Sequence, residues 1–149
     1  MTDELPHITV ATVIEHEGKF LMVEEGSAEQ PIFNQPAGHL ENGETLVEGA
    51  IRETLEETCW HVHVIGFLGV SQYIAKKTGV TYVRHTFVAN RISVDTKAKR
   101  DPDINDAVWM SYEEILEQGA YLRSPLVLND IQRYRRGKVS PIENIQGFL

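Results

Sequence analysis

Apolar, β-branched residues gather in two pairs of runs that predict two β-hairpins in the first two thirds of the chain. Residues 7–14 and 19–23 flank the polar turn 15–18, and a short turn ending in glycine between such runs is typical of a hairpin. Residues 62–74 and 80–92 flank a second turn of the same kind. We therefore expect a sheet at the centre of the molecule, with strands running in both directions.

A helix is predicted over residues 44–58, where apolar or small side chains recur every three to four positions without an internal proline. Acidic residues in its first turn favour a helix start there. Ahead of it, residues 32–35 should be extended, because Pro36 disfavours helix in the residue before it. A glycine-bearing loop is expected over residues 38–43.

Two shorter helices are expected toward the C-terminus. Ser111 and Glu114 have the spacing of a capping box, so a helix should run over residues 111–118. Another should begin at Ser124, with a proline in its first turn, and end before Gly137. Together with the strands, these helices indicate an α/β fold, and the last dozen residues are expected to form a tail along the surface.

Composition and charge restrict the function classes. The chain has 149 residues, 42% hydrophobic and 24% charged, which is ordinary for one globular domain, so a single domain is expected over residues 1–149. The net charge of -8 disfavours nucleic acid and anionic membranes as partners, because their phosphates would be repelled. Cys59 has no second cysteine to pair with, and no secretory signal or bilayer-spanning run is evident. A cytoplasmic protein is therefore expected.

Three glutamates on the predicted helix are the first candidates for chemistry. Glu53, Glu56 and Glu57 are spaced i, i+3 and i+4, which places their carboxylates on one helix face. A solvated acidic face is the common explanation for such spacing. However, the glycine-bearing loop 38–43 leads into this helix, and a loop followed by clustered carboxylates suits Mg²⁺, which prefers carboxylate and phosphate oxygens.

The spacing of these residues resembles the signature of the Nudix hydrolases. Gly38 is followed after five residues by Glu44, and after seven more by the segment 52–60, which contains Arg-Glu and Glu-Glu pairs. Fixed positions over 23 residues are far more specific than a three-residue motif. Cys59 stands where the signature has glycine, and Thr54 and Trp60 stand where bulky aliphatic residues are usual. The cysteine affects the expected turn after the helix rather than the metal site.

The resemblance implies an α/β/α sandwich with a mixed central sheet, in which the signature forms a loop-helix-loop. It also implies a Mg²⁺ cofactor, with Mn²⁺ as a substitute, which polarises the phosphate and activates the attacking water. The implied catalytic and metal-binding residues are Glu53, Glu56 and Glu57, with Gly38 in the metal set, whereas Glu44 and Arg52 are implied to be structural.

A further carboxylate from a later loop often completes Nudix sites. Asp103, in the acidic turn 101–106, is our candidate for the general base, with Asp106 as its nearest competitor. A solvated acidic turn is the alternative explanation of this segment. Glu41 is a candidate accessory ligand, and an exposed loop position is its alternative.

Further segments resemble a bacterial branch of the family, the NudJ-type phosphatases: 34–41, 44–48 and 122–127. This resemblance implies release of orthophosphate from nucleoside triphosphates and diphosphates and action on hydroxymethylpyrimidine pyrophosphate and thiamine pyrophosphate. It also implies a monomer, with a dimer as the alternative. The competing hypotheses are a Nudix pyrophosphohydrolase that releases pyrophosphate or cleaves ADP-ribose or dinucleotides, and a nucleotide-binding module without turnover.

Several residues outside the signature are candidates for contact with a small phosphorylated substrate. Arg123 next to Ser124, at a helix start, could hold a phosphate, although a surface arginine beside an N-cap serine is equally consistent with the pattern. Gln35 could hydrogen-bond a heterocycle and His39 could contact phosphate, with simple exposure as the alternative for both. Stacking on a ring is conceivable, with sheet packing favoured, for residues of the second hairpin: Tyr73, Tyr82 and Arg84.

Overall fold

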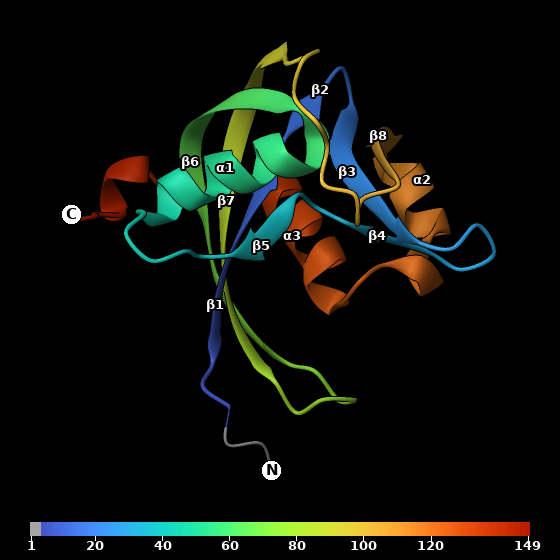
Figure 1. The fold of residues 1–149 in the computed structure, drawn as a ribbon, viewed down its shortest axis with the longest axis horizontal. Coiled ribbons are helices and arrows are strands. Elements are labelled where there is room, and N and C mark those ends of the chain that lie inside the picture. The colour runs from blue at the N-terminus through green and yellow to red at the C-terminus, as the bar shows by residue number, and fades with distance from the viewer. Residues whose placement is uncertain (1–3) are drawn as a thin grey trace.

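The computed structural model describes residues 4–149, which form two β-sheets and three α-helices around them (Figure 1). The strands are β1 (His7–Val13), β2 (Glu15–His16), β3 (Lys19–Gly26), β4 (Pro31–Asn34), β5 (Ala37–His39), β6 (Trp60–Ile74), β7 (Thr81–Val94) and β8 (Asp106–Ser111). The helices are α1 (Leu46–Thr58), α2 (Tyr112–Glu117) and α3 (Pro125–Arg135), with 3-10 turns η1 (Gly119–Tyr121) and η2 (Ile142–Asn144).

The strands are divided between two sheets. The first has the order β5-β1-β7-β6 and is mixed, because β1 and β7 are parallel while the other neighbours are antiparallel. In the second, β3 pairs antiparallel with β2, β4 and β8. The α/β class and the mixed sheet are thus confirmed. The sequence reading missed β8, and it assigned part of β5 to the loop, which instead begins at Leu40.

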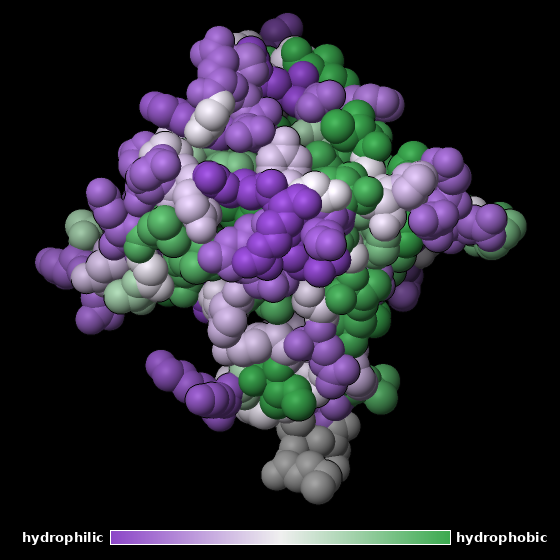
Figure 2. All heavy atoms as spheres, turned by 180° about the vertical axis from the view of Figure 1, so that it is seen from behind, coloured by the Kyte–Doolittle hydropathy of each residue, from purple (hydrophilic) through white to green (hydrophobic). Residues whose placement is uncertain are grey.

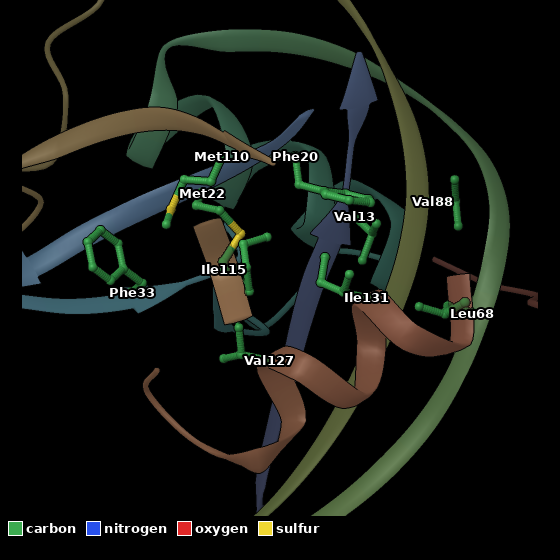
Figure 3. Packing of buried hydrophobic residues seen from close by; sticks show 10 residues of the cluster. All are labelled: Val13, Phe20, Met22, Phe33, Leu68, Val88, Met110, Ile115, Val127 and Ile131. Carbon is green, nitrogen blue, oxygen red and sulfur yellow. The ribbon is translucent and has the colours of Figure 1, made fainter. Parts of the chain in front are cut away.

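Alternation along β1 divides the core into two clusters. Val10 and Ile14 pack with Ala50 of α1 on one face of the first sheet. Val13 packs on the other face with Val127 and Ile131 of α3 (Figure 3). Successive side chains of a strand point to opposite faces, so α1 and α3 cover the two sides of this sheet. This arrangement is the expected α/β/α sandwich.

Side-chain caps fix the helix starts. The capping box predicted for α2 is present, with Ser111 accepting from the backbone of Glu114 and Glu114 accepting in return. Helix α3 begins after the cap Ser124, as predicted. Helix α1 begins at Leu46 rather than at residue 44, because Thr45 and Glu48 form another capping box there.

The two predicted hairpins are present. The second extends as an arm beyond the body of the molecule (Figure 1), whereas the first contains an additional two-residue strand, β2, where the whole of 15–18 was expected to be a turn. From behind, the surface shows a hydrophilic area at the centre with hydrophobic areas beside it (Figure 2). No helix within residues 4–149 has both the length and the apolar character needed to cross a bilayer.

Candidate active site

Helix α1 is attached to the first sheet by buried hydroxyl groups, which orient its glutamates. The Thr54 and Thr12 hydroxyls are 2.8 Å apart and both residues are buried. Thr54 also donates to the carbonyl of Ala50. The polar residue at this core-facing position is therefore satisfied by hydrogen bonds, as a buried hydroxyl requires.

Arg52 is the centre of an ion-pair cluster. Its Nε and Nη2 donate to the two carboxylate oxygens of Glu44 at 2.9 and 2.7 Å, and Nη2 also donates to the carbonyl of His39. Nη1 donates to Glu53 at 2.8 Å and to Glu56 at 3.2 Å. The bond from Arg52 holds the pKa of Glu44 below its ordinary value, and the same partners raise the pKa of Arg52. One guanidinium thus connects the loop to the helix carboxylates.

Glu53 lies against the backbone of the preceding loop. Its side chain is only 14% exposed, and burial raises the pKa of its carboxyl while Arg52 opposes that shift. A Cβ atom built on Gly38 would overlap the Glu53 carboxylate. Glycine at this position therefore allows the carboxylate to approach the loop backbone closely.

We call residues 38–60, which carry the signature, the box, and Glu53, Glu56 and Glu57 the box carboxylates. Glu57 is the most enclosed of the three, at 8% exposed. Its Oε1 accepts a 2.8 Å hydrogen bond from the backbone N–H of Ala37. Burial raises the pKa of Glu57 to about 8 despite that bond, and the negative charges of Glu53, Glu25 and Asp101 act in the same direction. The alternative explanation, a solvated acidic face, is therefore wrong for Glu53 and Glu57. It describes only Glu56, whose side chain is 49% exposed.

The acidic turn lies next to the C-terminal end of α1. The backbone N–H of Asp101 donates to the carbonyl of Glu56 at 2.8 Å, and Asp101 Oδ1 accepts from the backbone of Asp103. The side chain of Asp103 is exposed. Asp106 lies on β8 instead, 3.5 Å from Arg100. Of these aspartates, Asp101 is the one whose charge acts on the Glu57 pKa.

Gln35 does not face solvent. It is fully buried: its Nε2 donates to the carbonyl of Val127 at 2.8 Å, and its Oε1 accepts from Arg84. Arg84 is buried too, and it pairs with Asp130 at 3.1 Å. This placement corrects both expectations for Gln35, a heterocycle contact and strand-end exposure, because its amide is used inside the protein.

The other two substrate candidates lie at the surface. His39 is exposed, and its Nε2 is 2.9 Å from Nδ1 of His7. Arg123 is 54% exposed, and its Nη1 lies 3.1 Å from a carboxylate oxygen of Glu25. Glu41 is exposed as well, 3.5 Å from Arg52. Their predicted contacts with substrate or metal stay predictions.

Comparisons with known proteins identify this arrangement. The family model described as the NUDIX domain matches residues 5–130. The chain is 43% identical to "Phosphatase NudJ" of Escherichia coli strain K12 over 143 residues, which cover 96% of this chain and 92% of that protein. A solved "NUDIX hydrolase from Nitrosomonas europaea" superposes with a TM-score of 0.92 at 39% identity, covering 97% of this chain and 98% of the other. The chain belongs to the Nudix hydrolase family.

Each departure from the Nudix signature has a local explanation. Cys59 caps α1 in the left-handed region, with φ of 63°, and its N–H bonds to the carbonyl of Leu55. The cysteine thus adopts the conformation for which glycine is preferred there. Trp60 packs edge-to-face on Trp109, with ring centroids 6.0 Å apart, and so joins the two sheets. Thr54 stands in place of an aliphatic residue because its hydroxyl forms a buried hydrogen bond with the hydroxyl of Thr12.

The donors of the Nudix site fit a hard divalent cation by their chemistry, although their present arrangement is not a cage. Within residues 4–149, no three or more His, Cys, Asp or Glu side chains are placed to hold a metal ion, and Arg52 Nη1 pairs with both Glu53 and Glu56. The set nevertheless offers carboxylate oxygens, which Mg²⁺ prefers. Burial, with the charges of neighbouring carboxylates adding to it, raises the pKa values of Glu53 and Glu57, and a bound cation would oppose both effects.

Sequence reasoning missed two acidic residues beside Glu57. Glu25 lies beyond the run 19–23 that predicts the strand, but β3 continues to Gly26 and carries Glu25 toward α1. Asp101 stands in the acidic turn that was singled out, yet Asp103 was preferred there. The composition of the turn was a signal for both, but only the backbone bond from Asp101 to Glu56 distinguishes them.

Proposed function

We propose that this Nudix hydrolase cleaves phosphoanhydride bonds with Mg²⁺, or Mn²⁺ as a substitute, in nucleoside triphosphates and diphosphates and in small pyrophosphates such as hydroxymethylpyrimidine pyrophosphate and thiamine pyrophosphate. The observation that carries the proposal is the convergence of Glu53, Glu56 and Glu57 at one end of α1, beside Arg52 and the N–H of Ala37. Clustered carboxylates of this kind, two of them enclosed, suit a metal-phosphate site.

The residues of the proposed site have different roles. Bound Mg²⁺ supplies a Lewis acid that polarises the phosphoryl group and lowers the pKa of water. Glu53, Glu56 and Glu57 would hold it, with Gly38 beside them. Arg52 orients Glu53 and Glu56 through Nη1 and ties them to Glu44, and the Ala37 N–H fixes one oxygen of Glu57.

We propose Asp103 as the general base, because its exposed carboxylate belongs to a turn that is bonded to the end of α1. Replacing it by asparagine should lower kcat strongly, since general bases contribute roughly 10²–10⁴-fold. Asp101→Asn tests the neighbouring carboxylate, and Asp106→Asn tests the competing carboxylate on β8. A loss confined to Asp101→Asn would transfer the role to Asp101.

Orthophosphate is the proposed product. Support comes from the 43% identity to a relative named a phosphatase, which extends over 96% of this chain. A small phosphorylated substrate also agrees with the net charge of -8, which opposes long polyanions. We propose a monomeric, cytoplasmic enzyme, formed from one domain.

Phosphate release is the direct test. Nucleoside triphosphates, nucleoside diphosphates and thiamine-type pyrophosphates are incubated with Mg²⁺, with and without added inorganic pyrophosphatase. We expect orthophosphate without the helper enzyme. Release that depends on the helper would show pyrophosphate as the product and favour a conventional pyrophosphohydrolase. Tight nucleotide binding without any release would favour a binding module.

A further inference from the structure

A cavity of about 540 Å³ lies between the start of α3, the turn η1 and the arm of the β6–β7 hairpin. Its volume falls within the range of small-molecule sites, roughly 300–1,000 Å³. The box carboxylates do not line it. The lining residues that matter here are Tyr73, Leu122, Arg123, Leu128, Asn129 and Gln132.

The walls of the cavity combine a ring, aliphatic side chains and amides. Tyr73 comes from β6, where alternation leaves Ile74 exposed and Tyr73 half-buried. Leu122 directly follows the turn η1, and Leu128 lies in the first half of α3. Asn129 is exposed, and no hydrogen bond connects its side chain to another residue within 4–149. An aromatic face, apolar walls and a free amide suit a flat ring with polar edges.

Two charged residues connect the mouth of the cavity to the box. Arg123 lines the cavity and pairs with Glu25 at 3.1 Å. Glu25 is also close enough to Glu57 for its charge to affect that carboxylate. The Arg123 N–H also donates to the carbonyl of Phe33 at 2.8 Å. Phe33 lies on β4, which pairs with the part of β3 that carries Glu25, so the backbone holds Arg123 near Glu25. A diphosphate near the carboxylates could therefore extend past Arg123 into the cavity.

We propose that this cavity binds the organic part of the substrate, a flat nitrogen heterocycle, while the diphosphate lies at the box carboxylates. Tyr73 stacks on the ring, the two leucines enclose it, and the Asn129 amide bonds its polar edge. Arg123 exchanges Glu25 for a phosphate oxygen, since a guanidinium suits a phosphate as well as a carboxylate. This assignment rests on the proposed hydrolysis, because it names the part of that substrate which sets specificity.

Binding of non-hydrolysable analogues tests the cavity separately from turnover. Calorimetry with Mg²⁺ compares methylenediphosphonate, which lacks a ring, with the α,β-methylene analogues of ADP and of thiamine diphosphate. We expect at least one ring-bearing analogue to bind the wild type about tenfold or more tightly than methylenediphosphonate, which corresponds to about 1.4 kcal/mol. The two analogues distinguish a nucleoside from a thiamine-type ligand.

Asn129→Trp is designed to fill the cavity from an exposed helix position. It should abolish the preference for the ring-bearing analogue and leave methylenediphosphonate binding within twofold. Asn90→Trp is the matched control, because Asn90 is exposed on β7 and does not line the cavity. Thermal unfolding of both variants verifies that they are folded.

Tyr73→Leu gives a second test that does not add bulk. Loss of stacking on an aromatic side chain should weaken the ring-bearing analogue about fivefold or more, whereas Tyr121→Leu, on the exposed turn η1, should not.

Three results would overturn the proposal: no preference for either ring-bearing analogue, a preference that survives Asn129→Trp, or equal loss of methylenediphosphonate binding in that variant. Absence of hydrolysis with the ring preference intact would instead refute the proposed activity and leave the cavity assignment standing.

Discussion

Glu57 shows how burial changes the expected effect of a substitution. Glu57→Gln keeps the shape of the side chain and an oxygen for the Ala37 N–H, but it removes the charge. We expect turnover to fall by two or more orders of magnitude, because the metal set loses an anionic ligand. The folded protein should be retained, and steady-state kinetics beside thermal unfolding checks both parts.

The same substitution should change the pH dependence of stability in metal-free protein. The folded-state pKa of Glu57 is raised to about 8 from its ordinary 4.5, so folding favours the protonated carboxyl. Its contribution is fully present below pH 4.5 and is lost as pH rises toward 8. Wild type should therefore lose stability relative to Glu57→Gln between pH 5 and 8 in EDTA, by roughly 1–3 kcal/mol. Parallel denaturation curves for the two proteins would contradict the assigned shift.

Individual roles were the least predictable part of the site. Box spacing identified Glu53, Glu56 and Glu57 as one group, because helix periodicity alone brings them together. Spacing carries no information about burial by a distant segment, so the enclosure of Glu57 was missed. Gln35 was misplaced for the same reason, since its partners Arg84 and Val127 are 49 and 92 residues away.

The end of α1 allows an element-scale prediction. Cys59 holds φ of 63°, which costs a residue with a Cβ about 1–2 kcal/mol, whereas glycine adds about 0.5–1 kcal/mol of chain entropy to the unfolded state. Cys59→Gly should therefore stabilise the protein by about 0.5–1 kcal/mol. Cys59→Ala is the matched control, because it also removes the thiol but keeps the strained backbone, and it should give no gain. Chemical denaturation measures both, and equal effects would refute strain as the cause.

The ion pair between β7 and α3 gives a second element-scale prediction. Asp130 pairs with Arg84, both buried, and also accepts from Thr86 at 2.8 Å. Burial raises the pKa of Asp130 and lowers that of Arg84, against their mutual attraction. Asp130→Asn leaves a buried guanidinium without its counter-charge and should destabilise the protein by about 3–5 kcal/mol.

The control for this pair is Asp106→Asn, which breaks an exposed pair with Arg100 and should change stability by no more than about 1 kcal/mol. Urea denaturation of the two variants under identical conditions makes the comparison. A loss at Asp130 no larger than that at Asp106 would show that the buried pair is not required for stability.

Element prediction succeeded where local signals were strong. The helix pattern, the capping box at Ser111 and the N-cap at Ser124 are all present, because caps depend on residues three positions apart or fewer. Strand β5 has three residues, too short to show alternation, and burial along the six residues of β8 does not alternate. Their pairing partners, β1 and β3, lie far away in the sequence.

At the scale of the whole molecule, the class was predictable but the division into two sheets was not. Alternating runs and helices indicate α/β, and the Nudix signature implies a layered sandwich. Which strand pairs with which depends on long-range contacts, such as β1 with β7 in parallel and β3 with β8. Local patterns do not encode those pairings.

The net charge of the whole molecule determines how magnesium binding can be tested through stability. With a net charge of -8, added salt stabilises the fold by screening repulsion, so a specific magnesium effect must exceed that of NaCl at equal ionic strength. We expect MgCl₂ to raise the thermal midpoint further, because a ligand bound only by the folded state at 100 times its Kd adds about 2.7 kcal/mol. Glu53→Gln with Glu57→Gln should abolish that excess.

The matched control for this double variant is Glu113→Gln with Glu117→Gln, which removes two exposed charges from α2 and should keep the magnesium excess. Both pairs remove two negative charges, so any general effect of net charge is shared between them. Only a cation held at the end of α1 distinguishes the two variants. Equal magnesium shifts in both would therefore mean that the ion is not bound by the box glutamates.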